Sequence, residues 1–120
     1  MTESKSYTGG CHCGQVRYEV EADLAAPVIE CNCSMCGKSG TRLSFVPASQ
    51  FKLLQGDDHL TDYLFAKQHI HHLFCDVCGI KSFARGATPD GGQMIAVNTR
   101  CLDEIDLAAQ TVQHFDGQSI

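Results

Sequence analysis

The chain has 120 residues, a length typical of one domain. Fourteen acidic side chains against nine Lys and Arg give a formal net charge of −5, and the basic residues are scattered, so nucleic acid is not expected as a partner. No apolar run approaches the roughly 20 residues of a membrane span, and residues 1–10 lack the apolar core of a secretion signal, so we expect a cytoplasmic protein that does not enter a membrane.

Short apolar or alternating segments predict strands along most of the chain. Residues 15–21 alternate Val16, Tyr18 and Val20 with polar side chains, which is the period of a half-buried strand. Further strands are predicted at 28–29, 43–46, 51–54, 62–66, 69–74, 80–85, 94–98 and 111–115. Helical turns are predicted at 47–50 and 102–107, and chain reversals at 55–58 and 89–92.

These segments predict a mainly β fold with few short helical turns. We place residues 1–8 in a flexible N-terminal segment and residues 9–120 in a single domain. The apolar core is expected to contain Phe45, Phe65, Phe74 and Phe83. A core of this size is modest, so bound metal would add useful stability to the domain.

Eight cysteines are a high number for this length, and without a secretion signal they favour metal binding over disulfides. Seven of them form three clusters: Cys11/Cys13, Cys31/Cys33/Cys36 and Cys75/Cys78. A glycine follows the last cysteine of each cluster; the three glycines are Gly14, Gly37 and Gly79. Tight turns around a metal often need a positive φ, which glycine adopts without steric cost. The repeated detail therefore indicates metal-binding turns.

A closed structural zinc site needs four ligands, and seven thiols can be divided in more than one way. The simplest partition joins Cys11, Cys13, Cys75 and Cys78 into one site and leaves the central three thiols by themselves. Such a site would cross-link Cys11 and Cys75, which are 64 positions apart (75 − 11). A cross-link over so long a segment stabilises a fold because it restricts the unfolded chain. The alternative partition pairs Cys11 and Cys13 with two thiols of the central cluster.

Three thiolates leave a zinc with one open position, as catalytic zinc sites have. A zinc held by three sulfurs prefers another sulfur there, and an incoming thiol loses its proton on binding. This chemistry suits the activation of a small thiol. The alternative is a second structural zinc that a histidine or Cys101 completes.

Four segments together resemble the glutathione-dependent formaldehyde-activating enzyme (GFA) family, which also includes centromere-protein-V-like members. They are residues 10–14 (GCHCG), 31–36 (CNCSMC), 74–80 (FCDVCGI) and 97–102 (VNTRCL), and the resemblance extends over nearly the whole chain, as a short member. It implies a small, zinc-stapled, β-tent-like sheet domain. It also implies a structural zinc on Cys11, Cys13, Cys75 and Cys78 and a catalytic zinc on Cys31, Cys33 and Cys36.

The reaction implied by the resemblance joins formaldehyde to glutathione and gives S-hydroxymethylglutathione, and it is classed as a carbon–sulfur lyase reaction. The partners would be a glutathione-like thiol and an aldehyde. The alternative function is a non-catalytic, zinc-stabilised binding module, and the number of bound zinc ions would distinguish the two. The sequence makes no prediction of the oligomeric state.

Several other residues have both a functional and a structural interpretation. Cys101 is either a thiol near the central turn or a small buried apolar residue. Of the histidines before Cys75, His69 and His71 would share one strand face, and His72 on the other face could support a metal ligand. The cations that could bind the carboxylates of glutathione, or else be solvated surface charges, are Lys38, Arg42 and Arg100.

Overall fold

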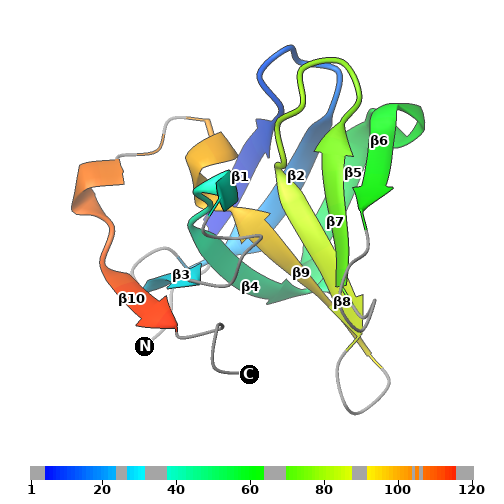
Figure 1. Ribbon diagram of the computed structural model, residues 1–120. Helices are drawn as coiled ribbons and strands as arrows, with labels where there is room; N and C mark the ends of the chain where they lie inside the picture. Colours follow the sequence, from blue (N-terminus) through cyan, green and yellow to red (C-terminus); the bar gives the residue numbers. More distant parts are fainter. Residues whose placement is uncertain are drawn as a thin grey trace.

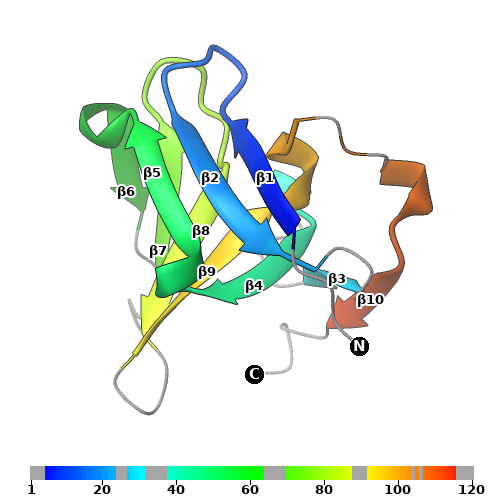
Figure 2. The same ribbon diagram turned by 180° about the vertical axis from the view of Figure 1, so that it is seen from behind.

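Ten strands arranged as two facing sheets make up the described part of the computed structural model (Figures 1 and 2), which covers residues 5–23, 27–31, 38–63, 70–87, 92–103, 105 and 107–115. The strands are β1 (Lys5–Gly10), β2 (Arg17–Ala22), β3 (Val28–Cys31), β4 (Leu43–Pro47), β5 (Phe51–Gln55), β6 (Leu60–Tyr63), β7 (Ile70–Cys75), β8 (Phe83–Ala87), β9 (Gln93–Asn98) and β10 (Val112–Phe115). The short 3₁₀ turns are η1 (Ala48–Gln50), η2 (Asp57–His59), η3 (Thr99–Cys101) and η4 (Leu107–Ala109).

The small sheet has the strand order β1-β2-β5, and the large sheet has the order β10-β3-β4-β9-β8-β7-β6. Neighbouring strands are antiparallel except for β10 and β3, which are parallel. The predicted mainly β class is therefore confirmed. No helix in the described segments is long and apolar enough to cross a membrane.

The β1 strand was not predicted, because its sequence KSYTGG has neither an apolar alternation nor a β-branched run. It forms because it pairs with β2 along its whole length, from Lys5 opposite Ala22 to Gly10 opposite Arg17. Residues 5–8, which we expected in a flexible segment, are thus part of this strand. The predicted helical turn at 102–107 is also displaced, since the 3₁₀ turns lie at Thr99–Cys101 and Leu107–Ala109.

The main core lies between the two sheets. In β2 the side chains of Tyr18, Val20 and Ala22 are buried and those of Glu19 and Glu21 are exposed, as the predicted alternation requires. Tyr18 and Phe51 of the small sheet meet Phe83 of the large sheet, with ring centroids 4.7–5.8 Å apart. The hydroxyl of Tyr18 donates a hydrogen bond to the carbonyl oxygen of Ser82 at 3.2 Å. These contacts hold the two sheets together in the middle of the domain.

A second, smaller apolar cluster lies on the other face of the large sheet. It consists of Leu43, Ala84 and Ala96, against which Ile29 and Cys31 pack. Phe45 points to this outer face and is 52% exposed, so its predicted place in the core is wrong. Its neighbour Val46 is buried toward the small sheet, and successive side chains of a strand point to opposite faces.

Gly10 is expected to tolerate no side chain. A Cβ atom there would lie 1.9 Å from the carbonyl oxygen of Val16, a backbone atom that cannot move aside alone. Gly10→Ala should therefore lower the free energy of unfolding by roughly 3 kcal/mol or more, at the severe end of overpacking. Gly40→Ala is the control, because Gly40 has open space around it and only its positive φ to strain, at about 1–2 kcal/mol. If urea unfolding showed the same loss of unfolding free energy in Gly10→Ala and Gly40→Ala, this expectation would be contradicted.

Candidate metal centre

The first cysteine turn, residues 11–14, joins β1 to β2. The backbone N–H of Cys11 donates to the carbonyl oxygen of Val16 at 3.1 Å, and the N–H of Val16 donates back to the Cys11 sulfur at 3.3 Å. Gly14 has a φ of +86°, as predicted for the glycine that follows the cluster. The turn thus presents both thiols on one side, with a backbone N–H directed at a sulfur.

The third cysteine turn, residues 75–79, follows β7 and repeats this construction. The N–H of Gly79 donates to the carbonyl oxygen of Cys75 at 2.9 Å, and the N–H of Val77 donates to the Cys75 sulfur at 3.3 Å. Gly79 has a φ of +80°, again as predicted. N–H groups aimed at sulfur stabilise the thiolate form, which is the form that binds metal.

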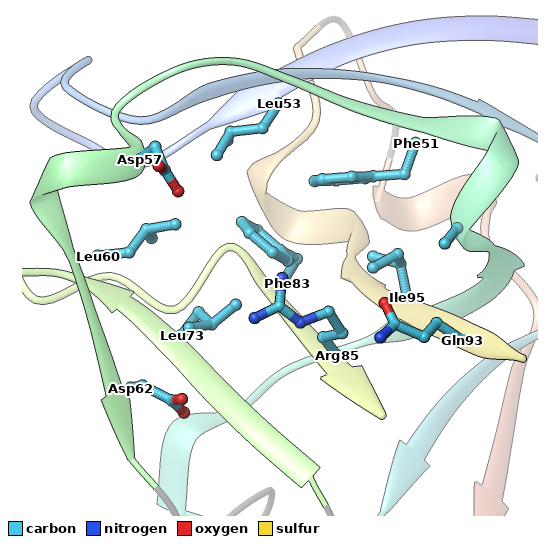
Figure 3. Close-up of a pocket in the computed structure, with 11 residues that line it drawn as sticks. Phe51, Leu53, Asp57, Leu60, Asp62, Leu73, Phe83, Arg85, Gln93 and Ile95 are labelled. Carbon is cyan, nitrogen blue, oxygen red and sulfur yellow. The ribbon is translucent and has the colours of Figure 1, made fainter. Parts of the chain in front are cut away.

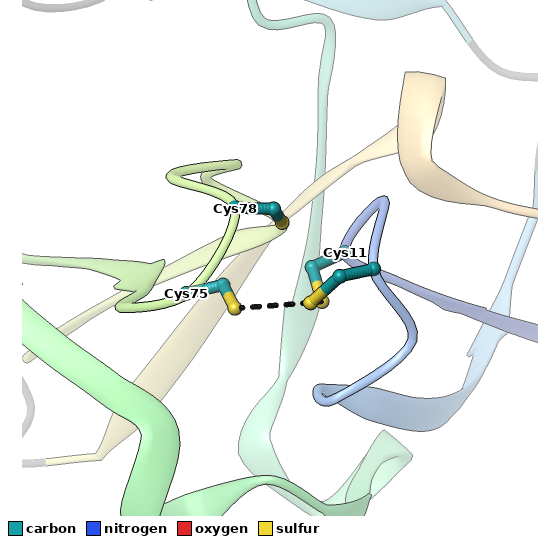
Figure 4. Close-up of side chains that lie close together, drawn as sticks. Cys11, Cys75 and Cys78 are labelled. Carbon is teal, nitrogen blue, oxygen red and sulfur yellow. Dashed lines mark hydrogen bonds between the residues drawn. The ribbon is translucent and has the colours of Figure 1, made fainter.

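The two turns bring the sulfurs of Cys11, Cys13, Cys75 and Cys78 within 4.8 Å of one another. Figure 4 labels three of these residues, Cys11, Cys75 and Cys78. The Cys13 sulfur lies 3.6 Å from the sulfurs of both Cys11 and Cys75. Zinc–sulfur bonds of about 2.3 Å in a tetrahedron place sulfurs about 3.8 Å apart, so the four residues fit a zinc-sized ion. Cys11 and Cys75 are buried and Cys13 is exposed, and none of the six described cysteines forms a disulfide.

The four thiols strongly affect one another's acidity. Desolvation raises the pKa of Cys78, but hydrogen bonds from the Ile80 backbone and from Cys13 outweigh it and lower that pKa to about 6. The Gln15 backbone lowers the pKa of Cys13, yet desolvation and the neighbouring thiols raise it to about 12. The thiols therefore cannot all ionise together easily without a cation, because like charges at this separation repel. A divalent metal ion would supply the opposite charge that stabilises four thiolates at this separation.

The central cysteine turn, residues 31–37, is described only at Cys31, the last residue of β3. Cys31 is partly exposed, packs against the outer apolar cluster, and is not one of the four clustered sulfurs. The proposed ligands Cys33 and Cys36 lie outside the described residues, as does Gly37. The structure thus groups the thiols of the first and third turns and places Cys31 apart from them.

Cys101 lies near the four-sulfur cluster without belonging to it. Its sulfur accepts a hydrogen bond from the side-chain amide of Asn98 at 3.5 Å. Desolvation, followed by the charges of Cys11 and Cys78, raises the pKa of Cys101 to about 11. A protonated, largely buried thiol fits the interpretation of Cys101 as a small apolar residue.

The cations considered for substrate binding have different surroundings. Arg42 donates from Nε to Glu30 Oε2 at 2.9 Å, so its charge is already paired within the fold. Lys38 and Arg100 are exposed. Neither forms an ion pair with another described residue, so within this part of the chain Lys38 and Arg100 are the better candidates.

Of the two described histidines in β7, only His72 is buried. His71 Nδ1 lies 2.6 Å from Asp62 Oδ2 at the surface, and His69 lies outside the described residues. Desolvation and the nearby positive charge of Lys81, opposed by Asp62, lower the pKa of His72 to about 4. His72 is therefore neutral at physiological pH.

A pocket of about 420 Å³ opens between the two sheets, and nothing in the sequence indicated it (Figure 3). Its apolar lining consists of Ala48, Phe51, Leu53, Leu60, Leu73, Phe83 and Ile95. Its polar lining places Asp57 and Asp62 on one side and Arg85 and Gln93 on the other. Two carboxylates and one guanidinium leave this lining net negative, so the pocket does not favour an anion such as glutathione.

The low pKa of His72 predicts how stability depends on pH. In the unfolded chain, His72 takes up a proton as the pH falls below its ordinary pKa of about 6.5. In the folded chain, it stays neutral until about pH 4. Stability should therefore fall as the pH drops through this range, by up to ~1.4 kcal/mol per pH unit from this residue. The free energy of unfolding, measured with urea, should fall less steeply over this pH range in His72→Gln than in the wild type. Parallel losses in the two proteins would contradict the assignment.

Two comparisons with known proteins agree with this geometry. The sequence profile described as glutathione-dependent formaldehyde-activating enzyme matches residues 6–118. The crystal structure of a Rhodobacter sphaeroides protein is similar to this fold, with a TM-score of 0.78 and 27% sequence identity. That similarity covers 90% of this chain and 99% of the other. With a match over almost its whole length, this chain belongs to the glutathione-dependent formaldehyde-activating enzyme family.

Proposed function

We propose that this protein is a zinc-dependent enzyme of the carbon–sulfur lyase type, which acts on the adduct of a glutathione-like thiol and an aldehyde. The observation that carries the proposal is the separation of the thiols, because Cys31 stands apart from the four clustered sulfurs. The described cluster offers the four ligands that a closed structural site needs, which supports a separate, chemical role for the central thiols. Family membership supports glutathione and formaldehyde as the reactants.

Cys11, Cys13, Cys75 and Cys78 would hold the structural zinc, and Cys31, Cys33 and Cys36 would hold the catalytic one. Zinc at the central thiols would act as a Lewis acid and would lower the pKa of a bound thiol. In the reaction a bond forms between the thiol sulfur and the aldehyde carbon. The thiol proton ends on the former carbonyl oxygen, which gives the hydroxymethyl group.

The exposed cations Lys38 and Arg100 would orient the substrate through its carboxylates. Lys38 directly follows the central cysteine turn, and Arg100 lies in η3, two residues after β9 ends at Asn98. The carbonyl oxygen of Arg42, near Lys38, accepts from the backbone N–H of Thr99, next to Arg100, at 2.7 Å. The two cations therefore belong to segments that are in direct contact.

The structural role of the four-sulfur cluster is tested by Cys75→Ser. Apparent zinc-binding energies in small domains are about 10–16 kcal/mol, as large as the stability of a whole domain. The variant should lose about one zinc per chain and unfold at a much lower temperature. Cys101→Ser is the matched control and should keep its zinc. A Cys75→Ser protein with full zinc content and an unchanged melting temperature would refute the structural site.

The catalytic role of the central turn is tested by Cys33→Ser. Its thiols enclose a very short loop, so metal loss there restricts the unfolded chain little and should cost much less stability. Cys33→Ser should stay folded, keep about one zinc, and lose formation of the thiol–aldehyde adduct. Zinc content, melting and NMR of formaldehyde with glutathione are measured on the same preparation. Unfolding comparable to that of Cys75→Ser would instead favour a structural site in a non-catalytic binding module.

A further inference from the structure

The pocket between the two sheets is built where their edges meet. β5 is the last strand of the small sheet and β6 the last strand of the large sheet, and the segment that contains η2 connects them. Phe51 and Leu53 of β5 line the pocket from one sheet, and Leu73 and Phe83 line it from the other (Figure 3). Small-molecule sites have volumes of about 300–1,000 Å³ and mostly apolar walls with a few polar groups. With about 420 Å³ and a lining of this kind, the pocket has the features of such a site.

The turn that carries Asp57 is held on both sides. Gly56, which precedes it, has a φ of +95°, and a Cβ atom there would lie 2.4 Å from the carbonyl oxygen of Gln15, so the turn packs directly against the small sheet's hairpin. On the other side, the backbone N–H of Asp76 donates to the carbonyl oxygen of His59 at 2.8 Å. The His59 Nδ1 atom also lies 3.1 Å from Asp76 Oδ1. These contacts fix the backbone at Asp57, and a site that is already formed loses less entropy when a ligand binds.

The fold itself uses only part of the charge that lines the pocket. Asp62 Oδ2 lies 2.6 Å from His71 Nδ1. Within the described part of the chain, Asp57 and Arg85 form no ion pair with each other or with another residue. These two opposite charges are therefore available to a ligand, and their places on different sides of the pocket fix the direction in which a polar ligand can lie (Figure 3).

The pocket and Cys31 lie on opposite faces of the large sheet. Phe83 and Ile95 belong to the core between the sheets and line the pocket. Their neighbours Ala84 and Ala96 belong to the outer apolar cluster, against which Cys31 packs. Successive side chains of a strand point to opposite faces, so the sheet itself separates the pocket from Cys31. A ligand in the pocket is therefore distinct from one that binds Cys31.

We propose that this pocket binds a small primary amine with an apolar body. Its ammonium group lies beside Asp57 and Asp62, because two carboxylates outnumber the single guanidinium of the lining. Its apolar body contacts Phe51 and Phe83, and a hydrogen-bond acceptor at its far end faces Arg85. A carboxylate in place of the ammonium group would meet two like charges, and a second ammonium group would meet Arg85. The ligand is therefore a monoamine and not an anion.

The experiment uses tyramine as the probe, because it has an ammonium group, an apolar ring and a phenolic oxygen. An NMR titration of the whole chain should give saturable shifts of the backbone N–H groups of Leu53, Leu73 and Ile95, which line the pocket. The matched anion 3-(4-hydroxyphenyl)propionate should bind at least about tenfold more weakly, because it places a carboxylate near the aspartates. Phenethylamine lacks the phenolic oxygen and should bind about 3–10-fold more weakly than tyramine, because it cannot accept from Arg85.

Three variants test which groups recognise the amine. Asp57→Asn keeps the shape of the side chain but removes its charge, so tyramine should bind roughly 2–5-fold more weakly, as expected for a partly exposed ion pair. Asp58→Asn is the matched control, because Asp58 is the next residue of η2, is exposed and is not part of the lining. It should leave the affinity unchanged. The double variant Asp57→Asn/Asp62→Asn leaves only Arg85 charged in the lining and should lose the preference for tyramine over the anion.

Several outcomes would overturn this inference. They are the absence of saturable shifts with tyramine, equal affinity for the matched anion, and equal weakening in Asp57→Asn and Asp58→Asn. The comparison of the two probes on the wild type decides even where a variant does not fold. Cys33→Ser should bind tyramine as the wild type does, and a loss of binding there would refute the separate pocket. Absence of thiol–aldehyde adduct formation would overturn the proposed function alone, because tyramine binding is measured independently.

Discussion

The rest of the structure depends on the convergence of four sulfurs from two turns that belong to different sheets. Residues 11–14 lie in the turn of the β1–β2 hairpin in the small sheet, and residues 75–79 lie in the connection from β7 to β8 in the large sheet. The sulfurs approach within 4.8 Å although Cys13 and Cys75 are 62 residues apart in the chain. Four thiols at this separation resist joint ionisation, so a cation is what makes the arrangement favourable.

The central cysteine turn has a different relation to the fold. Its flanking strands, β3 and β4, belong to the large sheet only, and Cys31 packs on the outer face of that sheet. The aromatic contacts of Tyr18, Phe51 and Phe83 hold the sheets together independently of this turn. In the proposed enzyme, such a division would let the central thiols bind and release a ligand without opening the core.

Some elements were predictable because their signal is local. The alternation in β2 predicts its buried face, and the glycines after Cys13 and Cys78 predict the positive φ that both turns have. β1 was not predictable, because its polar, glycine-containing sequence forms a strand only by pairing with β2. The exposed Phe45 was misplaced, because residue type alone does not tell which face of a sheet is covered.

By itself, therefore, the sequence determined the strand content, the turn geometry at two cysteine clusters, and a chemistry of thiols suited to metal. Only the tertiary structure decided which thiols meet, because that depends on how two sheets stack and not on any spacing along the chain. The same holds for the buried Asn98, whose amide accepts from the backbone N–H of Arg42 and donates to the Cys101 sulfur. Such partners are recognisable only once the chain is folded, since hydrogen bonding is short-ranged and directional.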